Sequence, residues 1–378
     1  MNKKHFLYNV IKEFFNPNEV LNIKIFGNGL INKTYLVEFN DIKYIIQKIN
    51  SHVFTSPMAV MHNIDLITNH LRKKLIYEGK NFQKRTLTLI QTKHNENFAI
   101  VDDEYWRCYI CIDGVTYEET SDPLIFYQAG IAIGEFQTLL NDFHTPLLYD
   151  NIKNFHNTPK RYIEFLKIVS NDLYNRKKHC LKEIMFINNR KDKMNIITQS
   201  LDNKKIPLRV VHNDTKLNNI MFDYNNKSLC LIDLDTTMKG SMLYDFGDAL
   251  RKGASTTSED DTNLNNVLIN FELIESFIEG FLISVKDIIT NNEINLLYEG
   301  YYIITLELGM RFLSDYLDND KYFTLDEEQK QKRPNINLER AKNQLKLLSE
   351  IENNELTIRK IINDKLKLIK ENDNEWIY

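Results

Sequence analysis

Short apolar runs that alternate with polar turn residues fill the first 112 residues of the chain. Alternation of apolar and polar positions is typical of strands that bury one face, and Gly, Asn and Asp between such runs favour turns. Strands are predicted at 21–26, 35–39, 43–50, 86–90, 98–101 and 105–112. Phe6, Val10 and Phe14 recur at helical spacing and predict a short leading helix. The pattern therefore predicts an antiparallel sheet accompanied by a helix.

Helical periodicity marks one stretch within these 112 residues, from residue 56, and most of the chain after them. Ser56 and Pro57 form a helix start, and apolar residues from Val60 to Leu71 mark one helical face. Further helices are predicted at about 123–140, 158–203 (one or two helices), 266–288, 292–318 and 337–370. The pattern predicts an α+β protein with two domains. A sheet-containing domain is expected at 1–112, and a larger, mainly helical domain at 113–378.

A strand, a polar loop and a hairpin follow one another near the middle of the chain. Residues 209–211 form a short apolar run that predicts a buried strand. Two more apolar runs, at 220–222 and 229–232, flank turn residues and predict a hairpin. A hairpin that folds back beside the preceding loop brings the end of that loop, Asn219, to the residue that ends the hairpin, Asp233.

The polar residues of this segment have the order and spacing of a kinase catalytic loop. His212, Asp214 and Asn219 form the pattern H-x-D-x-x-x-x-N, and Asp233 follows the hairpin. In phosphoryl transfer the first Asp contacts the hydroxyl that is phosphorylated, while the Asn and the later Asp hold magnesium on the phosphates of ATP. Asp214 is therefore the predicted catalytic base, and Asn219 and Asp233 are the predicted Mg²⁺ ligands. The alternative is an Asn-rich turn that only caps a hairpin, but the combined pattern favours the kinase interpretation.

The chain resembles the aminoglycoside phosphotransferase and choline kinase superfamily in three segments, HNDTKLNN, LIDLDT and GSMLYDFGDALR. Within that superfamily the resemblance is to N-acetylhexosamine 1-kinase and its relatives. It implies a bilobal protein-kinase-like fold, ATP-dependent phosphorylation of a small molecule, and support of the catalytic loop by Asp245. We also expect His212 to fix that loop, Asp235 to orient the residues around Asp233 or share the metal, and Thr215 to contact the substrate.

A glycine-containing turn between the first two predicted strands is the candidate nucleotide loop. Gly27, Asn28 and Gly29 occupy this turn. Glycine lets the backbone approach phosphates closely, and the N–H groups of such a loop can bind them. The resemblance to the sugar kinases places Asn32 and Thr34 in the same loop.

The next strand departs from the kinase pattern, because kinases carry a lysine there that pairs the phosphates. Alignment of 43–50 with V-A-I-K puts Gln47 at that position, so either Gln47 makes a neutral phosphate contact or the adjacent Lys48 serves. Residues 109–113 occupy the place of a hinge whose backbone binds adenine, with Cys111 as a nucleotide-binding candidate. The alternative is an ordinary strand end.

An apolar helix carries the candidate substrate face. Residues 301–313 are apolar nearly all round, yet Glu307, Arg311 and Asp315 step by four along one face. Buried charges have to pair or line a wet cleft, so these residues form either an internal ion network or a sugar-binding face. The resemblance of ELGMRFLSDYL to the corresponding sugar-kinase helix favours the second interpretation. Glu307 and Arg311 are then predicted to bind the substrate, with Tyr322 as an apolar wall for a sugar ring.

Composition indicates in which cellular compartment the protein works and which classes of partner it is not expected to bind. With 378 residues, 43% hydrophobic and 26% charged, the chain is long enough for two domains with cores. A net charge of −4 argues against a nucleic-acid partner. The four Cys are scattered, and the pair Cys108 and Cys111 lies in an apolar strand, so buried thiols in a reducing cytosol are expected. The sequence suggests neither a signal peptide nor a membrane span, so we expect a cytoplasmic protein without a membrane partner.

These observations predict a kinase that converts ATP and an N-acetylhexosamine into the sugar 1-phosphate and ADP, with Mg²⁺ as cofactor. Asp214 would contact the anomeric hydroxyl. A kinase of another small alcohol, such as choline, an aminoglycoside or an amino sugar, would use the same catalytic residues. A non-catalytic nucleotide-binding module is the alternative motivated by Gln47, and the intact Asp214, Asn219 and Asp233 argue against it.

Overall fold

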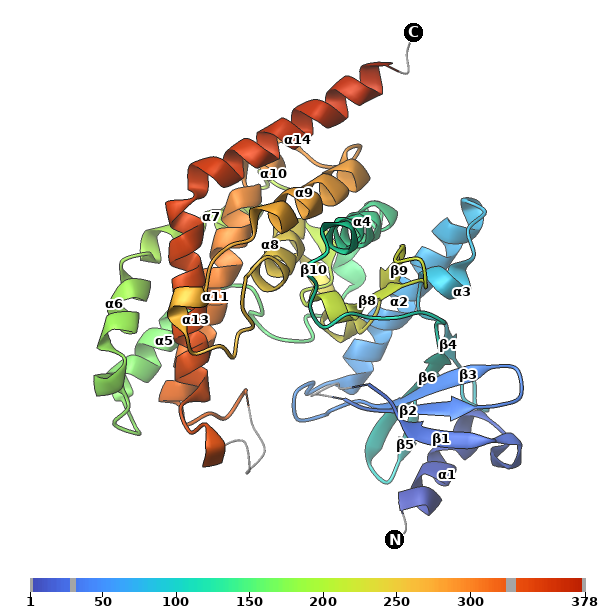
Figure 1. Cartoon of the computed structure of the whole chain (residues 1–378). Coiled ribbons are helices and arrows are strands. Elements are labelled where there is room, and N and C mark those ends of the chain that lie inside the picture. The colour runs from blue at the N-terminus through green and yellow to red at the C-terminus, as the bar shows by residue number, and fades with distance from the viewer. Residues whose placement is uncertain (1–2, 28–31, 324–330, 376–378) are drawn as a thin grey trace. The chain divides into compact units, whose positions relative to one another are not determined.

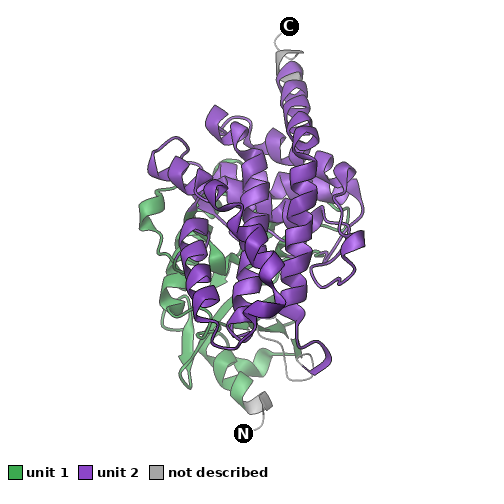
Figure 2. Cartoon of the chain, turned by 90° about the vertical axis from the view of Figure 1, so that its left-hand side faces the viewer, with its two compact units in different colours: residues 1–116, 142–153, 219–239 green, residues 117–141, 154–218, 240–378 purple. Residues whose placement is uncertain are grey.

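The computed structural model describes residues 3–27, 32–323 and 331–375 (Figure 1). Two residues of the predicted nucleotide loop, Asn28 and Gly29, lie outside these ranges. The chain divides into two compact units, which are coloured separately in Figure 2. Unit 1 comprises residues 1–116, 142–153 and 219–239, and unit 2 comprises residues 117–141, 154–218 and 240–378. Two segments of unit 1, 142–153 and 219–239, thus come later in the chain than residue 112, where the sequence places the end of the first domain.

Unit 1 is built on a six-stranded antiparallel sheet with strand order β1-β2-β3-β6-β4, in which β5 also pairs with β6. Its strands are β1 (Asn22–Ile25), β2 (Lys33–Glu38), β3 (Lys43–Lys48), β4 (Leu89–Ile90), β5 (Ala99–Val101) and β6 (Glu104–Ile110). The other elements of the unit are α1 (Lys3–Phe14), η1 (Pro17–Glu19), α2 (Pro57–Tyr77), α3 (Phe82–Arg85), η2 (Thr145–Leu147), β8 (Ile220–Phe222), β9 (Ser228–Leu231) and η6 (Leu234–Thr236). The antiparallel sheet and the six strands predicted from alternation are confirmed.

The two faces of this sheet differ in character. Helix α1 packs against one face, where its apolar side chains join Ile46 and Cys108 in a hydrophobic core (Figure 1). The strand register places Thr34 opposite Gln47 and Gln47 opposite Arg107, so these three side chains form a row across β2, β3 and β6. Successive side chains of a strand point to opposite faces, so this polar row lies on the face away from α1.

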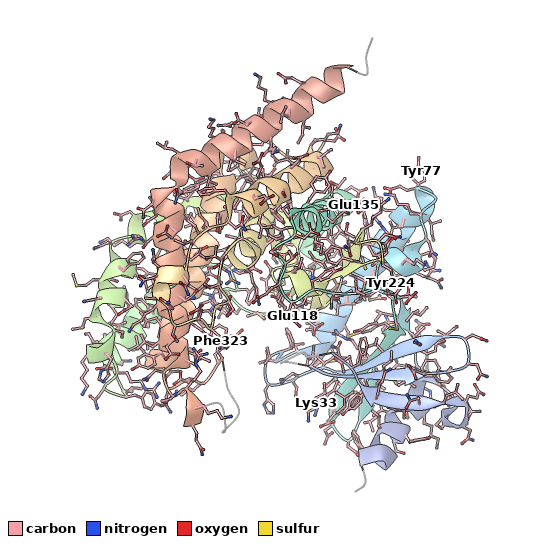
Figure 3. All side chains as sticks on the ribbon, in the orientation of Figure 1. Lys33, Tyr77, Glu118, Glu135, Tyr224 and Phe323 are labelled. Atoms are coloured by element: carbon pink, nitrogen blue, oxygen red, sulfur yellow. The ribbon has the colours of Figure 1, made fainter. Side chains whose placement is uncertain are left out.

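The predicted hairpin of the central segment forms within unit 1. Strands β8 and β9 pair antiparallel. Phe222, at the end of β8, exchanges two backbone hydrogen bonds of 2.9 Å with Val115. In the turn of the hairpin, the hydroxyl of Tyr224 (labelled in Figure 3) donates to Asp113 at 2.8 Å. These contacts tie the hairpin to the end of the sheet-forming segment.

Helix α2 connects the other parts of unit 1. Ser56 caps it, as predicted, by accepting the N–H of Ala59, and its apolar face is buried. Asn63 on this helix is fully buried and donates to the carbonyls of Tyr149 (2.9 Å) and Thr237 (3.0 Å). One side chain thus holds the 142–153 segment and the loop after the hairpin against α2.

Unit 2 is mainly helical. Its helices are α4 (Pro123–Leu139), α5 (Thr158–Asn171), α6 (Leu181–Asn188), α7 (Ile196–Asp202), α8 (Met242–Gly253), α9 (Phe271–Val285), α10 (Asn291–Asn295), α11 (Leu297–Leu317), α13 (Ile336–Asn353) and α14 (Glu355–Glu375). It also contains β7 (Arg209–Val211), η3 (Lys177–His179), η4 (Lys191–Lys193) and η7 (Leu264–Asn266), while η5 (Leu217–Asn219) and β10 (Met238–Gly240) fall where the chain passes from one unit to the other. No helix in the described ranges is both long and apolar enough to cross a membrane.

A close approach of two helices fixes the position of α8. A Cβ atom added to Gly247 would lie 2.2 Å from the carbonyl oxygen of Gly300 on α11. Only glycine leaves room for this backbone contact. Because α8 also packs on β7, it is held against the strand from which the candidate catalytic loop emerges.

Three helical predictions need correction. The stretch 158–203 forms three helices rather than one or two, and the first of them ends at Asp172, whose left-handed backbone (φ 39°) breaks the helix. The helix predicted at 292–318 is divided into α10 and α11. The long helix predicted at 337–370 is two helices separated at Asn354, which leaves helical geometry (φ −113°, ψ 17°). The α+β fold class itself is confirmed.

Candidate active site

The candidate catalytic loop in unit 2 is held by a buried carboxylate. Asp245, in the first turn of α8, is fully buried and accepts the backbone N–H of His212 at 2.9 Å and that of Asn213 at 2.7 Å. Gln137 donates to the same carboxylate at 2.8 Å. Asn213 has a left-handed backbone (φ 66°), a conformation that needs such external support. These contacts match the supporting role predicted for Asp245.

A second acid of α8 holds the next residue of the loop. Asp248 accepts the backbone N–H of Thr215 at 3.1 Å, and the Thr215 hydroxyl donates to the carbonyl of Asp245 at 2.7 Å. Thr215 is 1% exposed. Its hydroxyl hydrogen is therefore used within the protein, and the substrate contact predicted for Thr215 stays a prediction.

Asp214 stands between these two supported positions. Its backbone N–H donates to Nδ1 of His212 at 3.3 Å, and its carboxylate lies 3.0 Å from the Lys216 ammonium. Burial raises the pKa of Asp214, but Lys216 and the nearby His212 and Lys252 lower it further, so its net pKa lies below the ordinary value. The carboxylate is therefore ionised at neutral pH and able to accept a hydrogen bond from a hydroxyl.

The next turn of this loop is also tied down within unit 2. Asn218 donates through Nδ2 to the carboxylate of Glu118 at 2.6 Å, and Glu118 is labelled in Figure 3. Glu118 lies in the segment that precedes α4. The loop is therefore held both by this segment and by the acids of α8.

The predicted metal ligands Asn219 and Asp233 both belong to unit 1. The carbonyl of Asn219 accepts the N–H of Ile232, the residue before Asp233, at 2.8 Å, so the hairpin brings the two positions together as predicted. Asp233 has a left-handed backbone (φ 61°). One carboxylate and one amide oxygen are donors that suit Mg²⁺, which usually retains water and phosphate as its other ligands. In the described ranges, no group of three or more His, Cys, Asp or Glu side chains is arranged to hold a metal.

The polar row on the sheet of unit 1 contains two of the predicted nucleotide residues. Gln47 donates through Nε2 to the Thr34 hydroxyl at 2.9 Å. Its Oε1 accepts from Arg107, at 3.0 Å from Nε and 2.5 Å from Nη2. Arg107 is 2% exposed and also forms an ion pair with Asp235. Burial lowers the pKa of Arg107, but the carboxylates of Asp235 and, more weakly, Asp233 raise it, so this guanidinium is permanently charged.

Asp235 links this row to the nucleotide loop. Asn32, the described residue at the end of that loop, donates to Asp235 at 2.6 Å, and its own side-chain oxygen accepts the N–H of Asn50 at 2.9 Å. Asn151 donates to the Asp235 carbonyl at 3.1 Å. Both carboxylate oxygens of Asp235 thus have partners, which matches the orienting role more closely than a share in the metal.

Lys48 has a different environment from Gln47. It forms an ion pair with Glu104 at the start of β6, and its side chain is 27% exposed. Because side chains alternate along β3, Lys48 and Gln47 point to opposite faces of the sheet. Of the two phosphate contacts considered for this strand, the geometry favours Gln47.

The remaining nucleotide candidates lie at the two ends of the sheet. Gly27, which is described, has a left-handed backbone (φ 73°) that glycine adopts without strain. The backbone N–H of Cys111 donates to the carbonyl of Lys43 at 2.9 Å, so a contact of Cys111 with adenine would have to use its carbonyl or its half-buried thiol. All four Cys are free thiols, and burial raises the pKa of both Cys108 and Cys111.

The acid of the predicted substrate face is enclosed in protein. Glu307 is fully buried and binds His156 Nδ1 at 2.8 Å and the Thr158 hydroxyl at 2.6 Å. Burial raises the pKa of Glu307, but His156 and Arg161 lower it further, so its net pKa lies below the ordinary value. In this arrangement both carboxylate oxygens of Glu307 have partners within the protein, and its predicted contact with a substrate stays a prediction. Nε2 of His156 is buried and has no hydrogen-bond partner within the described ranges.

Arg311 borders a small cavity on the same helix. The cavity has a volume of about 180 Å³ and is lined by Arg161, Glu164, Ile168, Met310, Arg311, Ser314, Asp315, Asp318, Tyr322 and Phe323. The Arg311 guanidinium lies 5.1 Å from the ring centre of Phe155 and 5.5 Å from those of Tyr322 and Phe323. Asp315 instead accepts the backbone N–H groups of Tyr322 and Phe323. The internal Glu–Arg–Asp network considered above is thus not formed among the described residues.

Several residues that hold these sites were not identified from the sequence: Asn63, Arg107, His156, Arg161 and Asp248. Arg107 left the clearest signal, because a charged residue stands in the otherwise mostly apolar run WRCYI of a predicted strand. A charge in such a place is rarely buried without a partner. The partner, Asp235, is 128 residues away in the chain, and no local pattern indicates it.

The chain is similar to known proteins in sequence and in structure. A family model described as "Phosphotransferase enzyme family" matches residues 22–275. An aminoglycoside phosphotransferase from Alicyclobacillus acidocaldarius has a similar structure (TM-score 0.61, 12% identity, 91% of this chain and 95% of that chain covered). So do a choline kinase from Cryptosporidium parvum (TM-score 0.59, 14% identity, 96% and 99% covered) and the GDP complex of aminoglycoside 2'-phosphotransferase-IIIa (TM-score 0.56, 14% identity, 91% and 99% covered). These similarities confirm the predicted kinase-like fold class.

Proposed function

The chain belongs to the phosphotransferase enzyme family, and we propose that it transfers the γ-phosphoryl group of ATP to a hydroxyl group of a small molecule. The observation that carries the proposal is the loop around Asp214. Its backbone is fixed by Asp245 and Asp248, and its one partly exposed carboxylate is ionised. A carboxylate held in this way is suited to receive the proton of an acceptor hydroxyl or to orient that hydroxyl.

In this proposal the residues of unit 1 bind the nucleotide. Gly27, Asn32, Thr34 and Gln47 belong to the loop and the strand next to it, and backbone N–H groups and neutral amides are suitable donors to phosphate oxygens. One of the structural relatives was determined with GDP bound, which supports a nucleotide as co-substrate. The chemistry of Asn219 and Asp233 fits Mg²⁺, which when bound would neutralise negative charge on the phosphates.

The acceptor that we propose is an N-acetylhexosamine, phosphorylated at its anomeric hydroxyl. Arg311 borders the small cavity and forms no ion pair within the described ranges, so its N–H groups can donate to sugar hydroxyls or to an acetamido carbonyl. Tyr322 offers an apolar ring face beside it.

The same residues argue against a cationic acceptor such as choline or an aminoglycoside, the substrates named for two relatives. Aromatic side chains arranged around a cation are the usual way to recognise a quaternary ammonium group. Here Phe155, Tyr322 and Phe323 surround the guanidinium of Arg311, so the cage already holds a positive charge. A cationic acceptor would be repelled by it.

The test is to measure ADP formation with MgATP and a panel of acceptors: N-acetylglucosamine, N-acetylgalactosamine, glucose, choline and kanamycin. We expect turnover with an N-acetylhexosamine, and a product whose phosphorus signal is coupled to the anomeric proton in NMR spectra. Turnover only with choline or kanamycin would retain the kinase and refute the sugar site. Nucleotide binding without turnover on an extended panel would favour the non-catalytic alternative.

A further inference from the structure

The position that carries a phosphate-pairing lysine in kinases is occupied by a neutral residue here. Gln47 occupies that position on β3, and Lys48 points to the opposite face and pairs with Glu104. A neutral amide alone binds phosphate more weakly than an ammonium group does. The charge is therefore missing from the expected position on β3.

A buried cation lies one strand away in the same row. Arg107 on β6 is directly opposite Gln47, on the face of the sheet that is not covered by α1. It is 2% exposed. Charged side chains are almost never fully buried unless they are paired. The burial of Arg107 therefore depends on its partners, Gln47 and Asp235.

The chemistry of Arg107 fixes the orientation of the Gln47 amide. A guanidinium can only donate hydrogen bonds, and two of its nitrogens donate to the same side-chain oxygen of Gln47. The amide nitrogen of Gln47 must then face Thr34 on β2. Thr34 accepts one of its two hydrogens, and the other is the donor that a phosphate oxygen can use.

On its other side, Arg107 holds the carboxylate that joins two parts of the nucleotide site. Asp235 pairs with Arg107 and also accepts from Asn32 at the end of the nucleotide loop. Two residues before it stands Asp233, the proposed metal ligand, whose left-handed backbone depends on the loop being held in place. One guanidinium thus connects the sheet, the nucleotide loop and the metal-ligand loop within unit 1.

We infer that Arg107 is a positioning residue for nucleotide binding. From β6 it orients Gln47, which stands at the position of the kinase strand lysine, toward the phosphates, and it holds Asp235. The ligand class is a nucleoside triphosphate, recognised through its phosphates. Arg107 acts through Gln47 and Asp235 and does not itself touch the phosphates. The inference rests on the proposed function, because it assumes that unit 1 binds ATP.

The test compares variants of the full chain by their steady-state kinetics. In Arg107→Lys the charge remains, but a lysine cannot donate to Gln47 and Asp235 in the same forked geometry. We expect the KM for ATP to rise by about tenfold or more while the KM for the acceptor stays the same. Lys48→Met, a matched change on the neighbouring strand, should leave the KM for ATP unchanged.

A charge-exchange variant separates this role from a purely structural one. Arg107→Met should raise the KM for ATP further. Adding Gln47→Lys should restore it to within about threefold of wild type, because a lysine at this position pairs the phosphates directly and does not need Arg107 to orient it. If Arg107→Met does not fold, Arg107→Met combined with Asp235→Asn removes both buried charges and is compared with and without Gln47→Lys. Unfolding midpoints of all variants show which of them are folded.

The outcomes distinguish the two proposals. Wild-type KM for ATP in a folded Arg107→Lys variant overturns the inference, and so does a loss of stability without any change in that KM. A raised KM for ATP in Lys48→Met, or no recovery on adding Gln47→Lys, also contradicts it. A wild-type chain that neither binds ATP, measured by calorimetry, nor turns over any acceptor refutes the proposed function itself.

Discussion

The carboxylate of Asp245 accepts the backbone N–H of His212 at 2.9 Å, although the two residues are 33 positions apart in the chain. Asp245 lies in the first turn of α8, where a negative charge is favoured by the helix dipole. The close contact between Gly247 and Gly300 fixes that helix in turn. The conformation of the candidate catalytic loop therefore depends on the placement of α8 as much as on the loop's own residues.

Replacing Asp245 with Asn should impair both the loop and turnover. Three donors point at the carboxylate: the N–H groups of His212 and Asn213 and the side-chain amide of Gln137. In the variant, the NH₂ group of the new asparagine replaces one carboxylate oxygen, and at either position it faces at least one of these donors. We expect a loss of about 1–3 kcal/mol in the free energy of unfolding and a lower kcat. Urea unfolding and initial rates measure the two effects. The control is Asp150→Asn, an exposed acid outside the site, and an Asp245→Asn enzyme that matches this control would refute the bracing role.

Protonation of the Asp245 carboxylate should lower the activity at acidic pH, which gives the pH–rate profile an acid limb. Burial raises the pKa of Asp245 to about 6, and a protonated Asp245 loses acceptor capacity for the loop. We therefore expect kcat to fall below about pH 6. For stability the sign is opposite. The folded-state pKa is above the unfolded value, so folding takes up a proton and this group's contribution grows as pH falls through 6, by up to about 3 kcal/mol near pH 4.

A pH–rate profile compared with the pH dependence of unfolding checks both signs for Asp245. In Asp245→Asn the acid limb assigned to this group should vanish from the residual activity. An unchanged acid limb in the variant would assign it to another residue.

Arg251 should be a strong determinant of stability in unit 2. It donates to Asp248, at 2.8 Å from Nη2, and to Gln344 at 3.1 Å, and it pairs with Glu259. Removing one partner of a buried ion pair leaves uncompensated charge, so Arg251→Met should lower the free energy of unfolding by about 3–5 kcal/mol. Arg359→Met, which breaks a more exposed pair with Glu299, should cost less than about 1 kcal/mol. Equal losses in urea unfolding would contradict the difference in burial.

Glu259 adds a pH signature to this pair. Burial raises its pKa, but Arg251 and Lys252 lower it to about 2, below the value in the unfolded chain. Its contribution, about 2–3 kcal/mol, is present above about pH 4.5 and is lost as pH falls toward 2. Thermal or urea unfolding between pH 6 and pH 3 should show this loss in the wild type and a smaller one in Glu259→Gln. A parallel loss in both proteins would assign it elsewhere.

Arg311→Leu should weaken binding of the acceptor and change its class. The variant loses the donors proposed for the sugar and leaves the rings of Phe155, Tyr322 and Phe323 open to a cation. We expect the KM for an N-acetylhexosamine to rise by about tenfold, with an unchanged KM for ATP, and weak binding of choline to appear. The matched control is Arg190→Leu, an arginine stacked on Phe186 outside the cavity. An unchanged KM for the sugar in Arg311→Leu would remove Arg311 from the site.

Local patterns predicted the strands, the hairpin and the catalytic loop, because alternation and turn composition act over a few residues. They did not predict the Arg107–Asp235 pair, because strand order places β6 beside β3 and no sequence spacing indicates which distant loop reaches that row. They also gave no sign that Thr215 and Glu307 would be enclosed by partners. The partner of Thr215 lies on α8, and those of Glu307 are His156, before α5, and Thr158, its first residue. The break at Asn354 was missed because neither Pro nor Gly marks it.

The central claim, that the Asp214 loop catalyses phosphoryl transfer to a small-molecule hydroxyl, is tested most directly by the initial rate of ADP formation with MgATP and N-acetylglucosamine in wild type and Asp214→Asn. The account predicts steady turnover by the wild type, and a rate lower by about a factor of a thousand in a variant with the wild-type unfolding midpoint. An Asp214→Asn enzyme that forms ADP and sugar phosphate at the wild-type rate would contradict it.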